Sequence, residues 1–164
     1  FVNTLALRNY PKGELKIKEF LLDVKSKTLS CFDNQFYQLE NLIRELNIRP
    51  DINRNPLFDI MFVFQNYERT ELKLPNLTFS AYPKDNKVSK FDLTLFAMES
   101  EECIYFNFEY STDLYEKKTI ESFIEYFRKI VSIVTTDINK KLSDIDFFSK
   151  EDKAESNIVA NYSN

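Results

Sequence analysis

The stretch PDINRNPLFDIMFVFQN, residues 50–66, is the part of the chain that best predicts the fold. A polar segment with two prolines passes abruptly into the apolar run LFDIMFVFQ (57–65). Proline cannot continue a helix and restricts the residue before it, so a helix that precedes this stretch must end there. The apolar run is typical of a strand covered on both faces. We therefore predict a helix stop followed by a central strand.

The residues before this stretch predict one strand and two helices. FVNTLALR (1–8) is rich in residues that favour strands, and the turn signal NYPKG follows it. Apolar residues recur at helical spacing over 14–30 and again over about 35–47. Because the chain begins at Phe1, inside the predicted strand, we expect it to be part of a longer protein.

The residues after the stretch predict three more strands and a helix. A weaker strand is expected at 77–82 and a polar loop at 83–90. Two alternating segments, 91–99 and 103–110, are separated by so few residues that a tight hairpin should join them. A long helix follows, with these residues on one apolar face: Ile120, Phe123, Ile124, Phe127, Ile130, Val131 and Val134.

The predicted order is β-α-α-β-β-β-β-α. Helices on either side of a run of strands favour an α/β fold in which helices and sheet form separate layers. We expect a two-layer sandwich whose mixed or antiparallel sheet is flanked by helices.

The composition excludes several classes of function. The formal charge of the 164 residues is −4 and no Lys/Arg stripe stands out, which argues against nucleic-acid or anionic-membrane partners. No apolar run approaches the ~20 residues of a membrane span, and no secretory signal is present, so we expect a cytoplasmic protein. The chain has no histidine, the commonest general base and metal ligand. Its single glycine, Gly13, cannot form a glycine-rich phosphate loop.

The two cysteines, Cys31 and Cys103, lack CxxC spacing. We expect both to be reduced core thiols of a cytosolic protein. A disulfide between them stays open, although nothing local favours it.

Carboxylates are the remaining candidates for acid–base chemistry. Glu99, Glu101 and Glu102 cluster at the predicted hairpin, where a solvated turn is the favoured interpretation. Glu109 lies on the strand face opposite Phe106, and we expect it to be a surface or salt-bridged residue. Serine and threonine have no histidine to activate them, although a Ser–Lys pair stays open. No spacing supplies a metal site.

The polar segment NRNP has a structural interpretation. Asn53 and Asn55 can bond the backbone of a turn, and Arg54 is then a surface or ion-paired residue. Taken together and without reference to any family, these sequence features predict a soluble α/β piece without a catalytic base of its own.

Several stretches resemble motifs of the C-terminal half of condensation domains from nonribosomal peptide synthetases. FVNTLALR (1–8) is similar to the family motif (I/V)GxFVNTxxxR. PDINRNPLF (50–58) is similar to RDxSRNPLF, with proline and asparagine in place of the motif's arginine and serine. KFDLTLFAMES (90–100) and FEYSTDLY (108–115) are similar to the segments KFDLTL and EYSTDLF. These stretches follow one another along the chain in the family's order, so the resemblance extends over essentially the whole chain.

A further stretch, NQFYQLE (34–40), matches the family motif (H/N)QDxPFE in part. Phe36, Gln38 and Leu39 stand where the motif has Asp, Pro and Phe. The departure weakens any polar role for this segment, although a helix can still begin here.

The resemblance implies that residues 1–148 form the C-terminal lobe of a condensation domain with a chloramphenicol-acetyltransferase-like fold. Residues 149–164 then form a linker toward an adenylation domain. Such domains join donor and acceptor thioesters, held on the phosphopantetheine arms of peptidyl carrier proteins, by an amide bond in peptide antibiotic biosynthesis. The family's catalytic histidine, in the motif HHxxxDG, lies in the N-terminal lobe. We therefore expect this chain to bind no cofactor directly and to be inactive without that lobe.

The resemblance also implies roles for single residues. The substrate-tunnel contacts would be Asn3, Thr4, Gln65 and Asn66. The motif residues with a structural role would be Arg8, Asn34, Gln35, Arg54, Asn55 and Pro56. The polar stretch 83–90 is the candidate to reach the other lobe. Two alternatives stay open: a non-catalytic module that docks carrier proteins, and a small acyltransferase whose base is not histidine.

Overall fold

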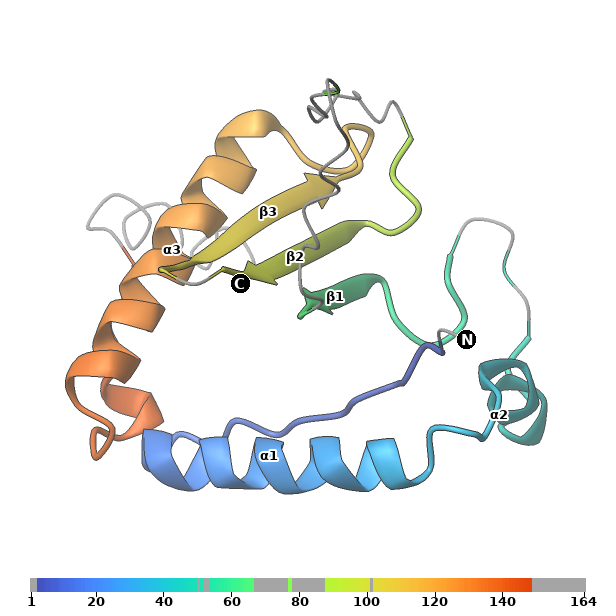
Figure 1. Cartoon of the computed structure of the whole chain (residues 1–164), viewed down its shortest axis with the longest axis horizontal. Coiled ribbons are helices and arrows are strands. Elements are labelled where there is room, and N and C mark those ends of the chain that lie inside the picture. The colour runs from blue at the N-terminus through green and yellow to red at the C-terminus, as the bar shows by residue number, and fades with distance from the viewer. Residues whose placement is uncertain are drawn as a thin grey trace, which may run out of the picture. The chain divides into compact units, whose positions relative to one another are not determined.

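A computed structural model describes residues 3–49, 51, 54–66, 77, 88–100 and 102–148. These residues form three helices and a three-stranded sheet, which confirms the α/β class (Figure 1). The chain divides into two compact units. Unit 1 comprises Phe1–Asn47 and Lys118–Asn164, and unit 2 comprises Ile48–Lys117. The helices therefore belong to unit 1, apart from the first residue of the last one, and the sheet belongs to unit 2.

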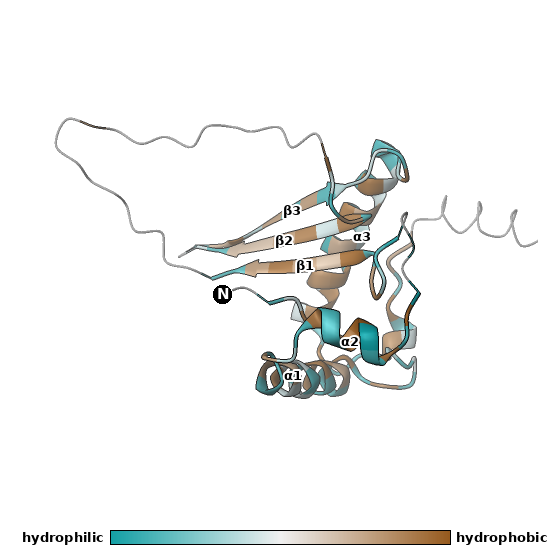
Figure 2. Ribbon diagram, turned by 90° about the vertical axis from the view of Figure 1, so that its right-hand side faces the viewer, coloured by the Kyte–Doolittle hydropathy of each residue, from teal (hydrophilic) through white to brown (hydrophobic). Residues whose placement is uncertain are grey.

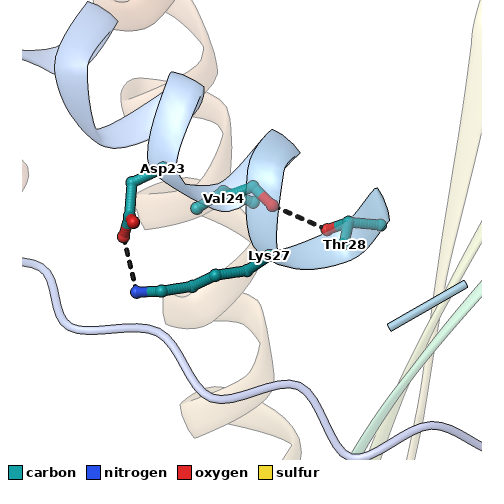
Figure 3. A network of polar contacts seen from close by, with 4 residues as sticks. All are labelled: Asp23, Val24, Lys27 and Thr28. Carbon is teal, nitrogen blue, oxygen red and sulfur yellow. Dashed lines mark hydrogen bonds and ion pairs between the residues drawn. The ribbon is translucent and has the colours of Figure 1, made fainter. Parts of the chain in front are cut away.

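Helix α1 spans Ile17–Asp33, three residues later at each end than predicted. The backbone N–H of Lys16 donates to Glu19 Oε2 over 2.9 Å, which satisfies a donor that the first helical turn leaves without a partner. Along the helix, Lys27 Nζ lies 2.6 Å from Asp23 Oδ2, and the Thr28 hydroxyl donates to the Val24 carbonyl over 2.8 Å (Figure 3).

Helix α2 spans Leu39–Glu45, which is shorter than the predicted 35–47. Residues 34–37 form a turn instead, in which the backbone N–H of Tyr37 donates to the Asn34 carbonyl over 3.0 Å. Asn47 has a φ of 51° just beyond the helix, the left-handed conformation that often ends helices and that asparagine tolerates. Local turn bonds therefore shorten this helix at both ends.

Helix α3 spans Lys117–Thr136, as its apolar spacing predicts. The chain then turns back to the start of α1. The backbone N–H groups of Ile17 and Lys18 each donate over 2.9 Å, to the carbonyls of Lys140 and Ile138 respectively. Ile17 of α1 is 1% exposed and Ile120 of α3 is 3% exposed, so each of these two helices buries an isoleucine.

The N-terminal segment differs from its prediction. Residues 3–12 belong to no helix or strand, so the predicted strand 1–8 is wrong over its described part. A strand needs a neighbour to bond its N–H and C=O groups, and strand-forming composition alone does not supply one. Within unit 1 the segment instead runs along α1 (Figure 1), where Lys27 Nζ lies 5.3 Å from the centre of the Tyr10 ring.

Three strands form the sheet of unit 2: β1 (Ile60–Gln65), β2 (Leu93–Glu99) and β3 (Ile104–Tyr110). Their order is β1-β2-β3, with β1 parallel to β2 and β2 antiparallel to β3. The predicted mixed sheet and the predicted hairpin are thus confirmed. The backbone N–H of Ser100 donates to the Cys103 carbonyl over 2.9 Å and closes the hairpin.

The prediction that the apolar run is a central strand, covered on both faces, is wrong for the described sheet. The middle strand is β2, where Thr94 and Ala97 are buried. In β1 the exposed fractions of Ile60, Phe62 and Phe64 are 61%, 60% and 46%. Apolar composition does not distinguish an edge strand from a middle one. Figure 2 shows hydrophobic residues along all three strands.

Some predictions concern residues that the structure does not describe. The weak strand 77–82 lies outside the described residues except for Leu77, and so does the loop 83–90 up to residue 87. The linker 149–164 lies outside them entirely.

Both cysteines are free thiols, so no disulfide joins them. Cys31 is half-buried in α1, but Cys103 is exposed. The prediction of a core thiol is therefore wrong for Cys103, because this residue lies in the hairpin turn. Among the described helices, none is long and apolar enough to cross a membrane.

Candidate functional site

The register of the three strands sorts their side chains onto two faces, since paired residues in a sheet point the same way. The apolar face carries Ile60, Phe62, Phe64, Leu93, Leu95, Ala97, Phe106, Phe108 and Tyr110. The mixed face carries Met61, Val63, Gln65, Thr94, Phe96, Met98, Tyr105, Asn107 and Glu109. The polar side chains of the sheet therefore all lie on the mixed face, apart from the phenol of Tyr110 and residues at the strand ends.

A cavity of about 310 Å³ opens on the mixed face. Its lining consists of Gln65, Phe96, Met98, Tyr105, Phe106, Asn107 and Glu109. All but Phe106 belong to the mixed face, and they come from all three strands. The cavity thus lies within unit 2, where the carboxyl ends of β1 and β2 meet β3.

The cavity is lined by both polar and apolar side chains. Gln65 and Asn107 each offer an amide that can both donate and accept hydrogen bonds, and Glu109 offers a carboxylate. Phe96 and Met98 of the middle strand lie between them. Among the described residues that line it, none is a cation. The cavity is open to solvent, because Tyr105, Phe106 and Asn107 of β3 are exposed.

Two of the predicted tunnel residues lie at the end of β1. Gln65 is half-buried and lines the cavity. Asn66 follows it, is exposed and is not among the lining residues. The structure therefore brings Gln65, but not its neighbour, to the cavity.

The other two predicted tunnel residues, Asn3 and Thr4, lie in unit 1. The side-chain amide of Asn3 donates to the Gln35 carbonyl, and its oxygen accepts from the backbone N–H of Thr4 over 2.9 Å. Asn3 is exposed and Thr4 is half-buried. The first of these bonds ties Asn3 to the turn that follows α1, so the Asn3 side chain already has a structural hydrogen bond.

The remaining motif residues of unit 1 hold local backbone or lie at the surface. Asn34 donates from its side chain to the Ser30 carbonyl over 2.8 Å, at the end of α1. The backbone carbonyl of Gln35 accepts the hydrogen bond from Asn3, and Gln35 itself is exposed. Arg8 is exposed on the N-terminal segment.

Arg54, Asn55 and Pro56 precede the sheet in unit 2. Arg54 Nη2 lies 3.1 Å from Asp59 Oδ2, one residue before β1, and the Arg54 side chain is 70% exposed. The prediction of a surface, ion-paired arginine is confirmed. Asn55 is half-buried and Pro56 is exposed, while Asn53, predicted to bond the turn, lies outside the described residues.

Sequence reasoning missed the polar groups that share the cavity with Gln65. Glu109, which we predicted to be a surface or salt-bridged residue, is half-buried and lines the cavity. The alternation in 103–110 does place Tyr105, Asn107 and Glu109 on one face. The pairing of β1 with β2 is what adds Gln65, and a sequence does not fix the register of strands so far apart.

Of the clustered carboxylates at the hairpin, Glu99 and Glu102 are not among the residues that line the cavity. Glu99 and Glu102 are exposed, which confirms a solvated turn for these two residues, and Glu101 lies outside the described part. Within the described ranges, no group of three or more His, Cys, Asp or Glu side chains could hold a metal ion.

Relatives cover nearly the whole chain. It is 41% identical over 153 residues to bacitracin synthase 3 of Bacillus licheniformis, covering 93% of this chain and 2% of that protein. It is 44% identical over 155 residues to gramicidin S synthase 2 of Brevibacillus brevis, covering 93% and 4%. The chain thus spans only a few per cent of the length of these synthetases.

Solved structures share the fold. The X-domain from teicoplanin biosynthesis matches with a TM-score of 0.77 at 18% identity, over 87% of this chain and 33% of that one. The starter condensation domain of rhizomide synthetase matches with a TM-score of 0.69 at 16% identity, over 90% and 35%. Residues 1–156 match the family model described as the condensation domain. The resemblance seen in the sequence motifs is therefore confirmed, and the chain belongs to the condensation domain family.

Proposed function

We propose that residues 1–148 are the C-terminal lobe of a condensation domain in a nonribosomal peptide synthetase, and that 149–164 lead toward an adenylation domain. In the complete domain, an amine on the acceptor carrier protein attacks the thioester on the donor carrier protein, and an amide bond forms. The thiolate of the donor's phosphopantetheine arm leaves. The relatives, synthases of bacitracin and gramicidin S, support a role in peptide antibiotic biosynthesis.

The observation that carries this proposal is the cavity on the mixed face, in a chain whose residues 1–156 match condensation domains. We assign to it part of the wall of the substrate tunnel. Gln65 lines the cavity, and Asn66, Asn3 and Thr4 are the further tunnel contacts proposed from the family resemblance. Holding two tethered reactants in place is a large source of rate acceleration, because it removes the entropy cost of bringing them together.

The lobe shapes the site but does not supply its base. The sequence contains no histidine, and the family's histidine motif belongs to the N-terminal lobe. The partners in this proposal are therefore that lobe, the peptidyl carrier proteins and the adjacent adenylation domain. Phosphopantetheine reaches the site on the carrier proteins and is not held by this chain as a cofactor of its own.

The test compares this chain with the complete condensation domain of its synthetase. Each is mixed with donor and acceptor aminoacyl carrier proteins, and the dipeptide is measured by mass spectrometry. We expect dipeptide from the complete domain and none from the chain alone. Turnover by the chain alone would instead support a small acyltransferase with a base other than histidine.

A separate measurement addresses the docking-module alternative. A carrier protein labelled with ¹⁵N is titrated with the chain, and its amide shifts are followed. Saturable binding by a chain whose complete domain forms no dipeptide would favour a docking module over a lobe of an active condensation domain.

A further inference from the structure

We propose that the outer face of helix α1 is a docking site for an acidic amphipathic helix of a partner protein. The face consists of five exposed residues, which we call the outer seam: Lys18, Leu22, Lys25, Leu29 and Phe32. It belongs to unit 1, whereas the proposed wall of the substrate tunnel belongs to unit 2. The inference therefore goes beyond the proposed function and does not depend on it.

The spacing of the outer seam is that of a contact between two helices. Its five residues follow one another at intervals of four, three, four and three positions along α1. This alternation is the a and d spacing of a heptad, which keeps side chains in one line where a second helix can pack against them. From Lys18 to Phe32 the line is about 21 Å long, or about four helical turns.

Apolar residues lie on two sides of α1. Ile17 is buried, and Phe20 and Val24, which share its side of the helix, are half-buried. On the outer seam, by contrast, the exposed fractions of Leu22 and Leu29 are 56% and 52%. A surface helix normally carries polar residues opposite its buried stripe, and exposed apolar side chains that gather in one place mark an interaction site. The pattern indicates a second contact on the outer side of α1.

The charge of the outer seam selects the partner. Neither Lys18 nor Lys25 forms an ion pair with any residue that the structure describes. The third lysine of the helix, Lys27, pairs with Asp23 on another side of α1 (Figure 3). Two unpaired cations within an otherwise apolar line attract carboxylates, although the whole chain has a formal charge of −4. The fitting partner is a helix with an apolar line that includes Asp or Glu.

The two lysines also argue against a second copy of this chain on the outer seam. Antiparallel packing along the whole seam would place Lys25 against Lys25 of the second copy. Parallel packing would place each lysine against its equivalent. Like charges that face each other at seam positions disfavour a pairing, whereas a partner with carboxylates at these positions has no such cost.

An anionic membrane fits the outer seam less well than a helix does. Helices that lie in a membrane surface bury a broad apolar face. The outer seam is narrow, because Ser26 and Ser30 lie beside it and are exposed. A line of single side chains suits the matching line of another helix.

The first experiment uses two synthetic peptides of three heptads, stapled to keep them helical, with leucine along their seam. One has glutamate at the two positions that face Lys18 and Lys25, and the other has lysine there. Binding is followed by the amide shifts of the ¹⁵N-labelled chain. We expect the glutamate peptide to bind about tenfold more tightly, and less so in high salt, since two exposed ion pairs replace two like-charge contacts. Equal affinities, or no binding of the glutamate peptide, would overturn the proposal.

The second experiment reverses the charge of the outer seam. The double variant Lys18→Glu, Lys25→Glu should prefer the lysine peptide. The matched control, Lys12→Glu with Lys118→Glu, changes two exposed lysines outside α1 and should bind like the unchanged chain. An unchanged preference in the seam variant would contradict recognition of charge.

A single variant removes an apolar contact and keeps both lysines. Because Leu29 is exposed, Leu29→Gln should leave the thermal unfolding of the chain almost unchanged but weaken binding of the glutamate peptide severalfold. Undiminished binding by a stably folded L29Q variant would contradict a contact along the seam.

The same variant separates the other occupants. Sedimentation of the chain tests a second copy, and flotation with vesicles of phosphatidylserine and phosphatidylcholine tests a membrane. We expect Leu29→Gln to change neither result. Self-association or vesicle binding that L29Q abolishes would assign the outer seam to that occupant and overturn the proposal.

Discussion

The two units of the chain use their polar side chains in different ways. In unit 1 these groups mostly bond nearby backbone, as Asn3, Thr28 and Asn34 do. In unit 2 the polar groups Gln65, Asn107 and Glu109 gather around a cavity on one face of the sheet. Polar side chains thus bond backbone in unit 1, whereas in unit 2 they line a concavity of the sheet.

The largest expected effect tests the core of unit 1. Ile17 is 1% exposed, and its replacement by alanine leaves a cavity where the first turn of α1 meets the segment after α3. Ile17→Ala should lower the free energy of unfolding by about 2–5 kcal/mol, as measured by urea denaturation. Leu22→Ala, on an exposed position of the same helix, is the control and should cost well under about 1 kcal/mol. Equal losses for the two variants would show that Ile17 is not a core residue.

The corresponding test in unit 2 concerns the middle strand. Ala97 is buried between Phe64 and Phe106 in the sheet register. Ala97→Leu adds volume where none is free and should cost about 1–3 kcal/mol of stability. Glu99→Leu adds a similar side chain at an exposed position of β2 and should cost much less. A neutral Ala97→Leu would indicate that the apolar face has room at this point.

A smaller effect is expected at the start of α1. Glu19→Ala removes the acceptor of the Lys16 backbone N–H and should cost about 1 kcal/mol. Glu19→Gln keeps an acceptor of the same length and is expected to retain most of the stability. Thermal unfolding of the two variants gives the comparison, and equal losses in both would show that the negative charge, and not the hydrogen bond, stabilises the helix end.

The smallest stability effect should be that of Arg54, whose ion pair with Asp59 is exposed to solvent. Arg54→Ala should cost about 0.2–1 kcal/mol, a loss that shrinks in high salt. In the complete domain, this variant should form dipeptide at nearly the unchanged rate. Normal stability with lost condensation would assign Arg54 a role in the reaction instead.

The sequence predicted the helices of unit 1 better than the strands. Ile120 and its partners on α3 follow a period of 3.6, which local geometry imposes whatever surrounds the helix. The predicted strand 1–8 is wrong over its described residues, 3–8, because a strand depends on a distant neighbour, and these residues carry no information about one. The same reason explains β1, where an apolar composition predicted coverage that Phe62 does not have.

The candidate site was predictable only in part. The family resemblance pointed to Gln65, and the alternation in β3 placed Asn107 and Glu109 on one face. That these three side chains share a cavity depends on parallel pairing of β1 with β2 across the long connection between them. Long-range register is the information that a single sequence does not contain.

We propose that the cavity of unit 2 forms part of the substrate tunnel. The most direct test measures the rate of dipeptide formation by the complete condensation domain, at saturating donor carrier and varied acceptor carrier, for Gln65→Ala and Asn66→Ala. Gln65 lines the cavity and Asn66 does not, so Q65A should lower the rate about tenfold, as expected for one lost hydrogen bond in a confined site, with a smaller effect of N66A. Unchanged turnover by a stably folded Q65A variant would contradict the account.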